Sequence, residues 1–352
     1  NKVGSIEAKL LSQKSSELVS NINTNIIAFP MNEEVLVASV NNKEYDNSII
    51  CSPFATYVKY PLDHMETFKA RWIKTLLVLN SSVMNLLCKA TRINKVVQLN
   101  NNLNSLIKHP HYFAQQLSNL TDLFTKKFPK HAIALFRVND TLDHELLASL
   151  KEKGYIIFPD RAAHVYFPDS GYIKRSHTKR DIALLRKTPY AIVEHDDIAE
   201  SDVERMSDLY RMLFIDKHSK FNPIYTKEYF EQSVKNKWHH YTALRNSDGQ
   251  IDAFISWFYR DNTMVCGPLG YDTNIDTKVG LYRMIIALCL KHANEHEYIF
   301  NMGAGSDIFK SNRGSRKTVE YTAVYCKHLP FYRHIPWRLF SLACNKLLDK
   351  IL

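Results

Sequence analysis

The order of elements predicted between residues 189 and 329 constrains the fold more than any other feature of this chain. Strand-like and helical patterns follow one another there as a strand, two helices, a three-strand meander, a long helix, a strand, a short helix and a final strand. Elements in this order bury their apolar faces most simply in a mixed sheet that carries helices on both faces. We therefore predict an α/β protein built on a mixed sheet.

Local patterns set the expected bounds of these elements. Strands are predicted at 190–198, 239–270 (three antiparallel strands), 298–305 and 320–329, and helices at 177–187, 201–214, 226–237 and 278–297, with a short helical turn at 306–315. The meander turns fall at 246–249 and 261–262, where Asn, Asp and Gly favour tight turns. Ser201 precedes Glu204 by three residues, which predicts a capping box at a helix start.

The first half of the chain carries a second group of elements. Helices are predicted at 5–23, 65–92, 112–128 and 142–154, strands at 132–138, 155–159 and 164–168, and strand-like runs around Ser52–Pro53. The 65–92 helix rests on the helical spacing of Phe68, Trp72, Leu76 and Leu79. We accordingly predict an N-terminal region 1–170, a central domain 171–335 and an amphipathic C-terminal helix 336–352.

Charge and cysteine usage narrow the class of protein. The chain has 46 Lys and Arg against 36 Asp and Glu, a formal charge of +10 that attracts anions such as nucleic acid, a membrane surface or a phosphorylated cofactor. Its six cysteines are far apart, with no CxxC pair and no zinc-site spacing. We therefore expect buried thiols, a cytoplasmic location and no metal. No apolar run approaches 18 residues, so no membrane span is expected.

Two basic segments are candidates for binding an anion. Gly303, Gly305 and Gly314 flank Ser306, Lys310 and Arg313, so backbone N–H groups and a helix start could hold a phosphate there. The helix predicted at 177–187 carries Lys179 and Arg180 and could hold a pyrophosphate or an RNA backbone. The alternative for both segments is a set of solvated basic side chains.

The elements from about residue 142 to 329 resemble the GNAT acyltransferase superfamily, and within it the Fem-type and BioF-like branch. The resemblance is carried by LLASLKEKGYIIFP (146–159), SHTKRDIALLRK (176–187) and IFNMGAGSDIFKSNRGS (299–315). It implies a GNAT-like mixed sheet flanked by helices. It also implies a tandem arrangement, in which residues 112–170 belong to a degenerate first GNAT-like unit.

The resemblance also implies an activity. A GNAT-type N-acyltransferase moves an acyl group from an acyl-CoA or acyl carrier protein thioester to an amine or hydroxyl of a small molecule by direct attack. The usual acyl-CoA signature, [RQ]xxGx[GA], is absent from GYDTNIDTKVGLYR (270–283), and some Fem-type proteins use aminoacyl-tRNA instead. Two alternatives therefore stay open, an aminoacyl-tRNA-dependent transferase and a non-catalytic GNAT-fold binding module.

Candidate catalytic groups follow from the same resemblance. In GNAT enzymes the third meander strand splays from its neighbour, and a free backbone N–H there polarises the thioester carbonyl. Gly267, between Cys266 and Pro268, lies at the matching point and suits a bulge. Direct attack needs a base and an acid, for which we select Asp272, Tyr282 and His240. His239 and His240 are adjacent on a strand, so at most one of them faces the site.

The tail, residues 336–352, combines Trp337 and Phe340 with Arg338 and Lys346. A basic amphipathic helix of this kind either closes a core or lies on anionic lipid. We prefer the first interpretation, in which peripheral membrane contact is not required.

Overall fold

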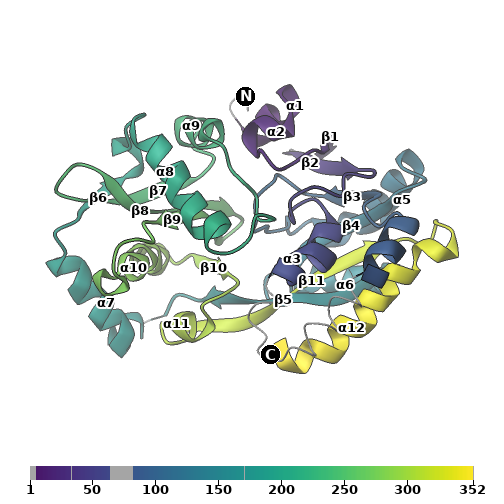
Figure 1. Ribbon diagram of the computed structural model, residues 1–352. Coiled ribbons are helices and arrows are strands. Elements are labelled where there is room, and N and C mark those ends of the chain that lie inside the picture. The colour runs from purple at the N-terminus through teal and green to yellow at the C-terminus, as the bar shows by residue number, and fades with distance from the viewer. Residues whose placement is uncertain (1–4, 33, 64–81, 170, 352) are drawn as a thin grey trace. The chain divides into compact units, whose positions relative to one another are not determined.

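The computed structural model describes residues 5–32, 34–63, 82–169 and 171–351, and it confirms the prediction of an α/β protein with a mixed sheet (Figure 1). The strands of the described residues are hydrogen bonded in the order β1-β2-β3-β4-β11-β5-β10-β9-β8-β7-β6. The chain divides into two compact units. Unit 1 comprises Asn1–Asp160, Ser219–Ile224 and Glu320–Ile351, and unit 2 comprises Arg161–His218 and Tyr225–Val319. The consecutive division predicted at residues 170 and 335 stays a prediction.

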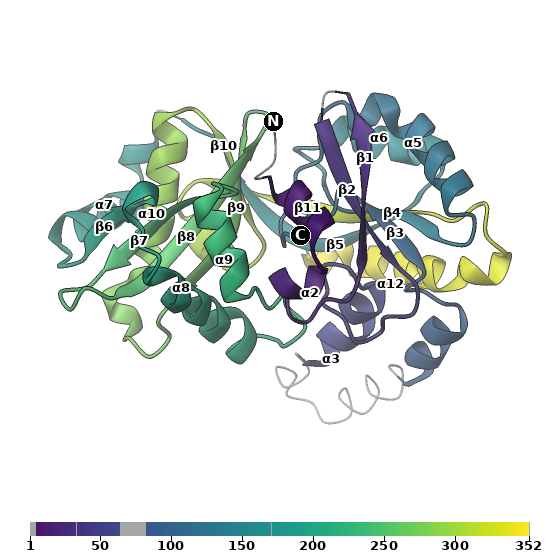
Figure 2. The same cartoon turned by 90° about the horizontal axis from the view of Figure 1, so that it is seen from above.

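Unit 1 contains two layers of helices on opposite faces of its strands (Figure 2). Its elements are α1 (Ile6–Ser12), α2 (Ser15–Leu18), β1 (Asn25–Met31), β2 (Glu34–Asn41), the π-helical turn η1 (Ala55–Lys59), α3 (Tyr60–Asp63), β3 (Val96–Leu99), α5 (Phe113–Lys127), β4 (Ala132–Asn139), α6 (His144–Lys153), the start of β5 (Ile156–Tyr166), the end of β11 (Ser315–Tyr325), η7 (Phe331–Arg333) and α12 (Ile335–Ile351). Phe124 of α5 and Leu150 of α6 lie in one core, and Trp337 and Phe340 of α12 lie in the other.

Unit 2 is built on an antiparallel meander. Its elements are η3 (Tyr172–Lys174), α7 (Ser176–Lys187), β6 (Ala191–Glu194), η4 (His195–Asp197), α8 (Asp202–Arg211), η5 (Met212–Asp216), α9 (Lys227–Lys235), β7 (His240–Arg245), β8 (Ile251–Arg260), β9 (Thr263–Tyr271), η6 (Thr277–Val279), α10 (Leu281–Glu295), β10 (Ile299–Gly303) and α11 (Asp307–Ser311). Helices α8 and α9 lie on one face of these strands, and α10 with α7 on the other (Figure 1).

The two units repeat one pattern, which bears out the expected tandem arrangement. In unit 1 the 15-residue α5 links β3 to the parallel strand β4, and in unit 2 the 15-residue α10 links β9 to the parallel strand β10. A short helix and an 11-residue strand follow each parallel strand, α6 and β5 in one case, α11 and β11 in the other. Each of these long strands ends beside the other repeat, since β5 pairs with β10 and β11 pairs with β4. This exchange explains why Glu320–Ile351 belong to unit 1, although they follow unit 2 along the chain.

Most elements predicted in residues 112–329 are confirmed. Four of the predictions for the whole sequence are wrong, two of them before residue 112 and two within this range. The predicted 5–23 helix is two short helices, and the run around Ser52–Pro53 leads into η1 instead of strands. Residues 156–166 form one strand, not two. Ser201 makes no capping hydrogen bond because its backbone is already helical, at φ −64° and ψ −21°. The hairpin β1–β2 was not expected.

Part of the 65–92 helix prediction lies outside the described residues, including Phe68, Trp72, Leu76 and Leu79. Residues 82–90 are helical, as predicted. Among the described residues, no helix is long and apolar enough to cross a membrane.

Candidate active site

Strand β9 pairs with β10 only along its first three residues. The parallel pairs run from Thr263–Ile299 to Val265–Asn301, and they go no further along these two strands, both of which are described in full. Beyond Val265, β9 continues to Tyr271 as a partner of β8 alone. The ladder between the two strands therefore ends before Cys266, the point at which the splay is expected to begin.

A β-bulge lies at the start of this splay. Trp257 pairs with Cys266 and Ile255 pairs with Leu269, so Gly267 and Pro268 together oppose the single residue Ser256. Ser256 Oγ donates a 2.6 Å hydrogen bond to the Pro268 carbonyl oxygen, which holds the bulge in shape. The prediction of a bulge at Gly267 is thus confirmed.

Glycine is required at position 267 because His239 covers it. A Cβ atom added to Gly267 would lie 2.5 Å from both His239 Cδ2 and Ser256 Oγ. The His239 ring is buried, and Ser233 Oγ lies 3.1 Å from its Nδ1 atom. Burial lowers the pKa of His239 to about 3, so the ring is neutral, and its Nε2 atom lacks a hydrogen-bond partner among the described residues. From the sequence we selected His240 and not its neighbour His239. Nothing in the sequence at the start of this strand indicates that His239 is the buried one.

The glycine loop after β10 turns through left-handed backbone, as its composition predicted. Gly303, Gly305 and Ser306 have φ values of +69°, +77° and +56°. Lys310, however, is not the surface side chain that we expected. It is only 2% exposed, and its Nζ donates to the carbonyl oxygens of Met302, Gly303 and Ala304 at 3.0, 3.0 and 2.8 Å. The left-handed turn removes these carbonyls from the sheet, and a buried ammonium satisfies them.

A buried carboxylate anchors the basic helix α7 to this loop. Asp181 of α7 is 1% exposed and accepts from Arg313 Nε at 2.6 Å and from Arg283 Nε at 2.9 Å. Arg313 also donates to the Phe309 carbonyl and lies over the Phe309 ring at 3.4 Å. Asp181 therefore balances the charge of Arg313. The sequence had suggested instead that Arg313 is free to bind a phosphate. In the sequence, the feature that could have indicated this contact is Asp181 itself, the one acidic residue in the basic helix.

The other two basic candidates keep the exposure that an anion-binding role requires. Lys179 and Arg180 are exposed on α7, beside the buried Asp181. They share that helix with the exposed Arg186 and Lys187. Within the described residues no carboxylate is paired with Lys179 or Arg180 in the structure.

Tyr282 lies between the splay and the glycine loop. Its ring centroid is 4.9 Å from that of Phe309 in α11 and 6.0 Å from that of Tyr271 in β9. Burial raises the pKa of the Tyr282 phenol to about 12, although a hydrogen bond with the Ser306 side chain and the positive charge of Arg313 oppose the shift. The structure thus brings Tyr282, Ser306 and the loop glycines together, next to Cys266.

Asp272 and His240 are placed apart from this group. Asp272 directly follows β9 and accepts a 2.6 Å hydrogen bond from Arg205 of α8. Burial disfavours ionisation of Asp272, but Arg205 and the Asn274 N–H outweigh it and lower the pKa of the carboxyl group. His240 is exposed at the start of β7 and stacks on Trp257 with ring centroids 6.1 Å apart. The roles selected for these two residues stay predictions.

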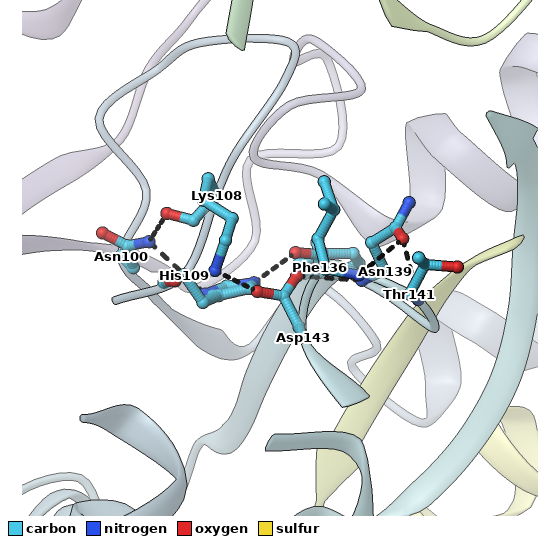
Figure 3. Close-up of polar contacts among 8 residues, drawn as sticks. Asn100, Lys108, His109, Phe136, Asn139, Thr141 and Asp143 are labelled. Atoms are coloured by element: carbon cyan, nitrogen blue, oxygen red, sulfur yellow. Dashed lines mark hydrogen bonds and ion pairs between the residues drawn. The ribbon is translucent and has the colours of Figure 1, made fainter. Parts of the chain in front are cut away.

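Unit 1 has a closed polar cluster at the corresponding place in its own repeat. The segment between β3 and α5 carries the buried Lys108 and His109 (Figure 3). Lys108 Nζ donates to Asp143 Oδ1 at 2.8 Å, and His109 Nε2 lies 2.9 Å from the Phe136 carbonyl oxygen. Asp143 also accepts from the Asn139 backbone N–H at 3.0 Å. These buried groups bond to one another, so the cluster ties the β3–α5 connection to the β4–α6 connection.

Comparisons with known proteins agree with this architecture. No family model and no curated protein matches the sequence. Among solved structures, the crystal structure of FemX is similar over 90% of this chain and 91% of that chain, with 10% identity and a TM-score of 0.53. The structure of L-PGS from Bacillus licheniformis aligns over 70% of this chain and 82% of that chain, with 15% identity and a TM-score of 0.49. A tandem GNAT protein from the clavulanic acid biosynthesis pathway aligns over 67% and 76%, with 10% identity and a TM-score of 0.41. The likeness to FemX extends over nearly the whole of both chains and shows that this chain shares its fold, as the resemblance to Fem-type proteins predicted.

Proposed function

We propose that this protein is an acyltransferase, and that it moves an acyl group from an activated donor to an amine or hydroxyl acceptor by direct attack. The observation that carries the proposal is the bulge at Gly267–Pro268, which lies where β9 leaves β10. Strand separation frees backbone N–H groups from the sheet, and a bulge re-aims them. Such a group can stabilise the negative charge that develops on the acyl oxygen during attack. Pro268 has no N–H, so the donors in this stretch are Cys266, Gly267 and Leu269.

Tyr282 is the acid that the geometry supports best. Its pKa of about 12 keeps the phenol protonated at neutral pH, so it can donate a proton to the departing group of the donor. The exposed Ser306 side chain interacts with this half-buried phenol and lowers its pKa, so the phenol has a polar neighbour at the surface. Asp272 and His240 stay as candidates for the base. The reaction as proposed uses no metal.

Unit 2 is favoured over unit 1 as the location of the reaction. The two segments that connect a meander strand to a long helix differ in their burial. In unit 1 this segment is filled by the buried side chains of Asn101, Lys108 and His109. In unit 2 the corresponding segment exposes Asn274 and Lys278. The exposed segment of unit 2 is therefore the more accessible of the two to a donor.

The donor is either a thioester, as in acyl-CoA or an acyl carrier protein, or an aminoacyl ester on tRNA. The exposed basic residues of α7 favour the tRNA alternative, because they extend over a helix face longer than a pyrophosphate. A thermal-shift series with acetyl-CoA, longer acyl-CoAs and tRNA separates these donors, because a ligand that binds only the folded state raises the melting temperature. Stabilisation by tRNA that falls steeply with salt would identify the second donor. No stabilisation by any of them would favour a non-catalytic binding module.

The test of the chemistry compares two tyrosines. Tyr282→Phe should lower the transfer rate about a hundredfold, the lower end of the range for a general acid, with little change in melting temperature. Tyr271→Phe is the matched control, because its ring is 6.0 Å from that of Tyr282 and it has no assigned part in the reaction. Equal rates for the wild type and Tyr282→Phe, measured as thiol or tRNA release, would remove Tyr282 from the mechanism.

A further inference from the structure

Helix α12 of unit 1 has apolar residues on two opposite faces. Its inner face packs Trp337 and Phe340, 1% and 7% exposed, into the core of unit 1. Its other side, with the turn that precedes it, is also apolar, yet exposed to solvent. We call this second set the outer face. It consists of Phe331 (80% exposed), Tyr332 (41%), Ile335 (37%), Leu339 (39%) and Leu342 (61%).

The helical residues of the outer face form a stripe. Ile335, Leu339 and Leu342 are spaced i, i+4 and i+7, so they share one side of the helix (yellow in Figure 1). Scattered exposed apolar residues are ordinary on a protein surface, whereas contiguous ones mark a site of interaction. The exposed Arg338 lies at i+3 from Ile335 and borders the stripe, and the exposed Lys346, at i+11 from Ile335, continues the same side of the helix beyond Leu342.

The outer face lies in a segment without acidic residues. No Asp or Glu occurs between Glu320 and Asp349, although Lys327, Arg333, Arg338 and Lys346 do. From Phe331 to Lys346 the chain therefore combines aliphatic and basic residues without an acid, which is complementary to a surface that is apolar inside and negatively charged outside.

Positive charge also gathers beneath the first turn of α12. Arg333 is 5% exposed, and its guanidinium donates to the carbonyl oxygens of Arg92, Lys95 and Lys130 at 3.1, 3.2 and 3.3 Å. The basic residues drawn together in this way repel one another. The pKa of Lys95 is lowered by its partial burial, and then by the charges of Arg92, Arg333 and Lys130. This cluster adjoins Phe331 along the chain, so the same end of the helix carries both apolar exposure and uncompensated positive charge.

We propose that the outer face of α12 docks on an anionic lipid surface. RNA is a poorer fit, because it is held by stacking and by phosphate contacts; Phe331 and Tyr332 could stack, but the aliphatic Ile335, Leu339 and Leu342 offer neither kind of contact. A second copy of this chain is also a poorer fit, since a twofold contact would set Arg338 and Lys346 against the same residues of its partner. A bilayer interface accepts the aliphatic stripe among its acyl chains and the two basic residues among its headgroups. This docking does not rest on the proposed transfer reaction.

The test measures binding of the full chain to phosphatidylcholine vesicles with and without phosphatidylglycerol. We expect binding to the anionic vesicles, much weaker binding to the neutral ones, and a decrease with added salt. Phe331→Ser with Leu342→Ser should lower the partition coefficient at least about tenfold, as the loss of two buried apolar side chains implies. Arg338→Glu with Lys346→Glu should lower it by a similar factor, because each basic residue near an anionic surface contributes roughly fivefold.

Matched controls separate the outer face from exposed apolar residues in general. Ile308 and Ile173 of unit 2 are 80% and 61% exposed, equal to Phe331 and Leu342. Ile308→Ser with Ile173→Ser should leave vesicle binding unchanged, and all variants should keep the wild-type melting temperature because the replaced side chains are exposed. Absence of binding to anionic vesicles, or an equal loss in the control pair, would overturn the proposal. A concentration-dependent dimer that only the Phe331 and Leu342 variants abolish would assign the outer face to a second copy instead.

Discussion

Replacement of Lys310 by methionine tests how the glycine loop is held together. Methionine keeps most of the apolar stem and removes the ammonium, which leaves the carbonyls of Met302, Gly303 and Ala304 without this donor. A buried polar group that loses its partner costs about 1–3 kcal/mol, and hydrogen bonds to charged groups are at the upper end. Three carbonyls lose their donor, but partial relaxation of the loop toward water reduces the total cost. We therefore expect a loss of about 3 kcal/mol in the free energy of unfolding.

The assay is thermal and urea unfolding of the full chain, with Lys278→Met as the control. Lys278 is an exposed lysine of the same unit, so its replacement should change stability by less than about 0.5 kcal/mol. For a domain of 150–250 residues, about 3 kcal/mol corresponds to a fall of roughly 6–12 °C in melting temperature. An unchanged melting temperature together with lost turnover would refute this reasoning, because it would show that Lys310 contacts a ligand and not the backbone carbonyls.

Three further predictions concern unit 2. Asp181→Asn should lower the free energy of unfolding in urea by about 3–5 kcal/mol, because it leaves the buried Arg313 without its counter-charge. Arg283→Ala should lower it less, because the Arg283 side chain is 38% exposed. Gly267→Ala should lower transfer activity at least about tenfold and should also lower the melting temperature, because its Cβ would displace His239; wild-type values for both would contradict the packing of the bulge. His239 has a folded-state pKa of about 3, below its unfolded value, so at acidic pH the unfolded state binds a proton that the folded state does not. The free energy of unfolding should therefore keep its full value above about pH 6.5 and fall by about 2 kcal/mol by pH 5. This loss should be absent from unfolding curves of His239→Asn.

The sequence alone determined the parts of the fold that depend on local patterns. The 15-residue helix α10 has an apolar pattern strong enough to be predicted without its neighbours, and so does α5. The β7–β8–β9 meander follows from strand patterns separated by turn residues. Gly267 next to Pro268 indicated a bulge because neither residue fits a regular ladder. These features suffice for the GNAT-like order of elements, and the structure confirms it.

Tertiary structure decided which polar side chains are available for chemistry. Sequence gives the charge of Lys310 and Arg313 but not their partners, which are carbonyls of the loop in one case and Asp181, 132 positions away, in the other. His239 and His240 are neighbours in sequence with the same side chain, yet one is buried over Gly267 and the other is exposed. Burial and pairing arise from contacts between elements far apart in the chain, so they are fixed only when the sheet has formed and its helices have packed against it.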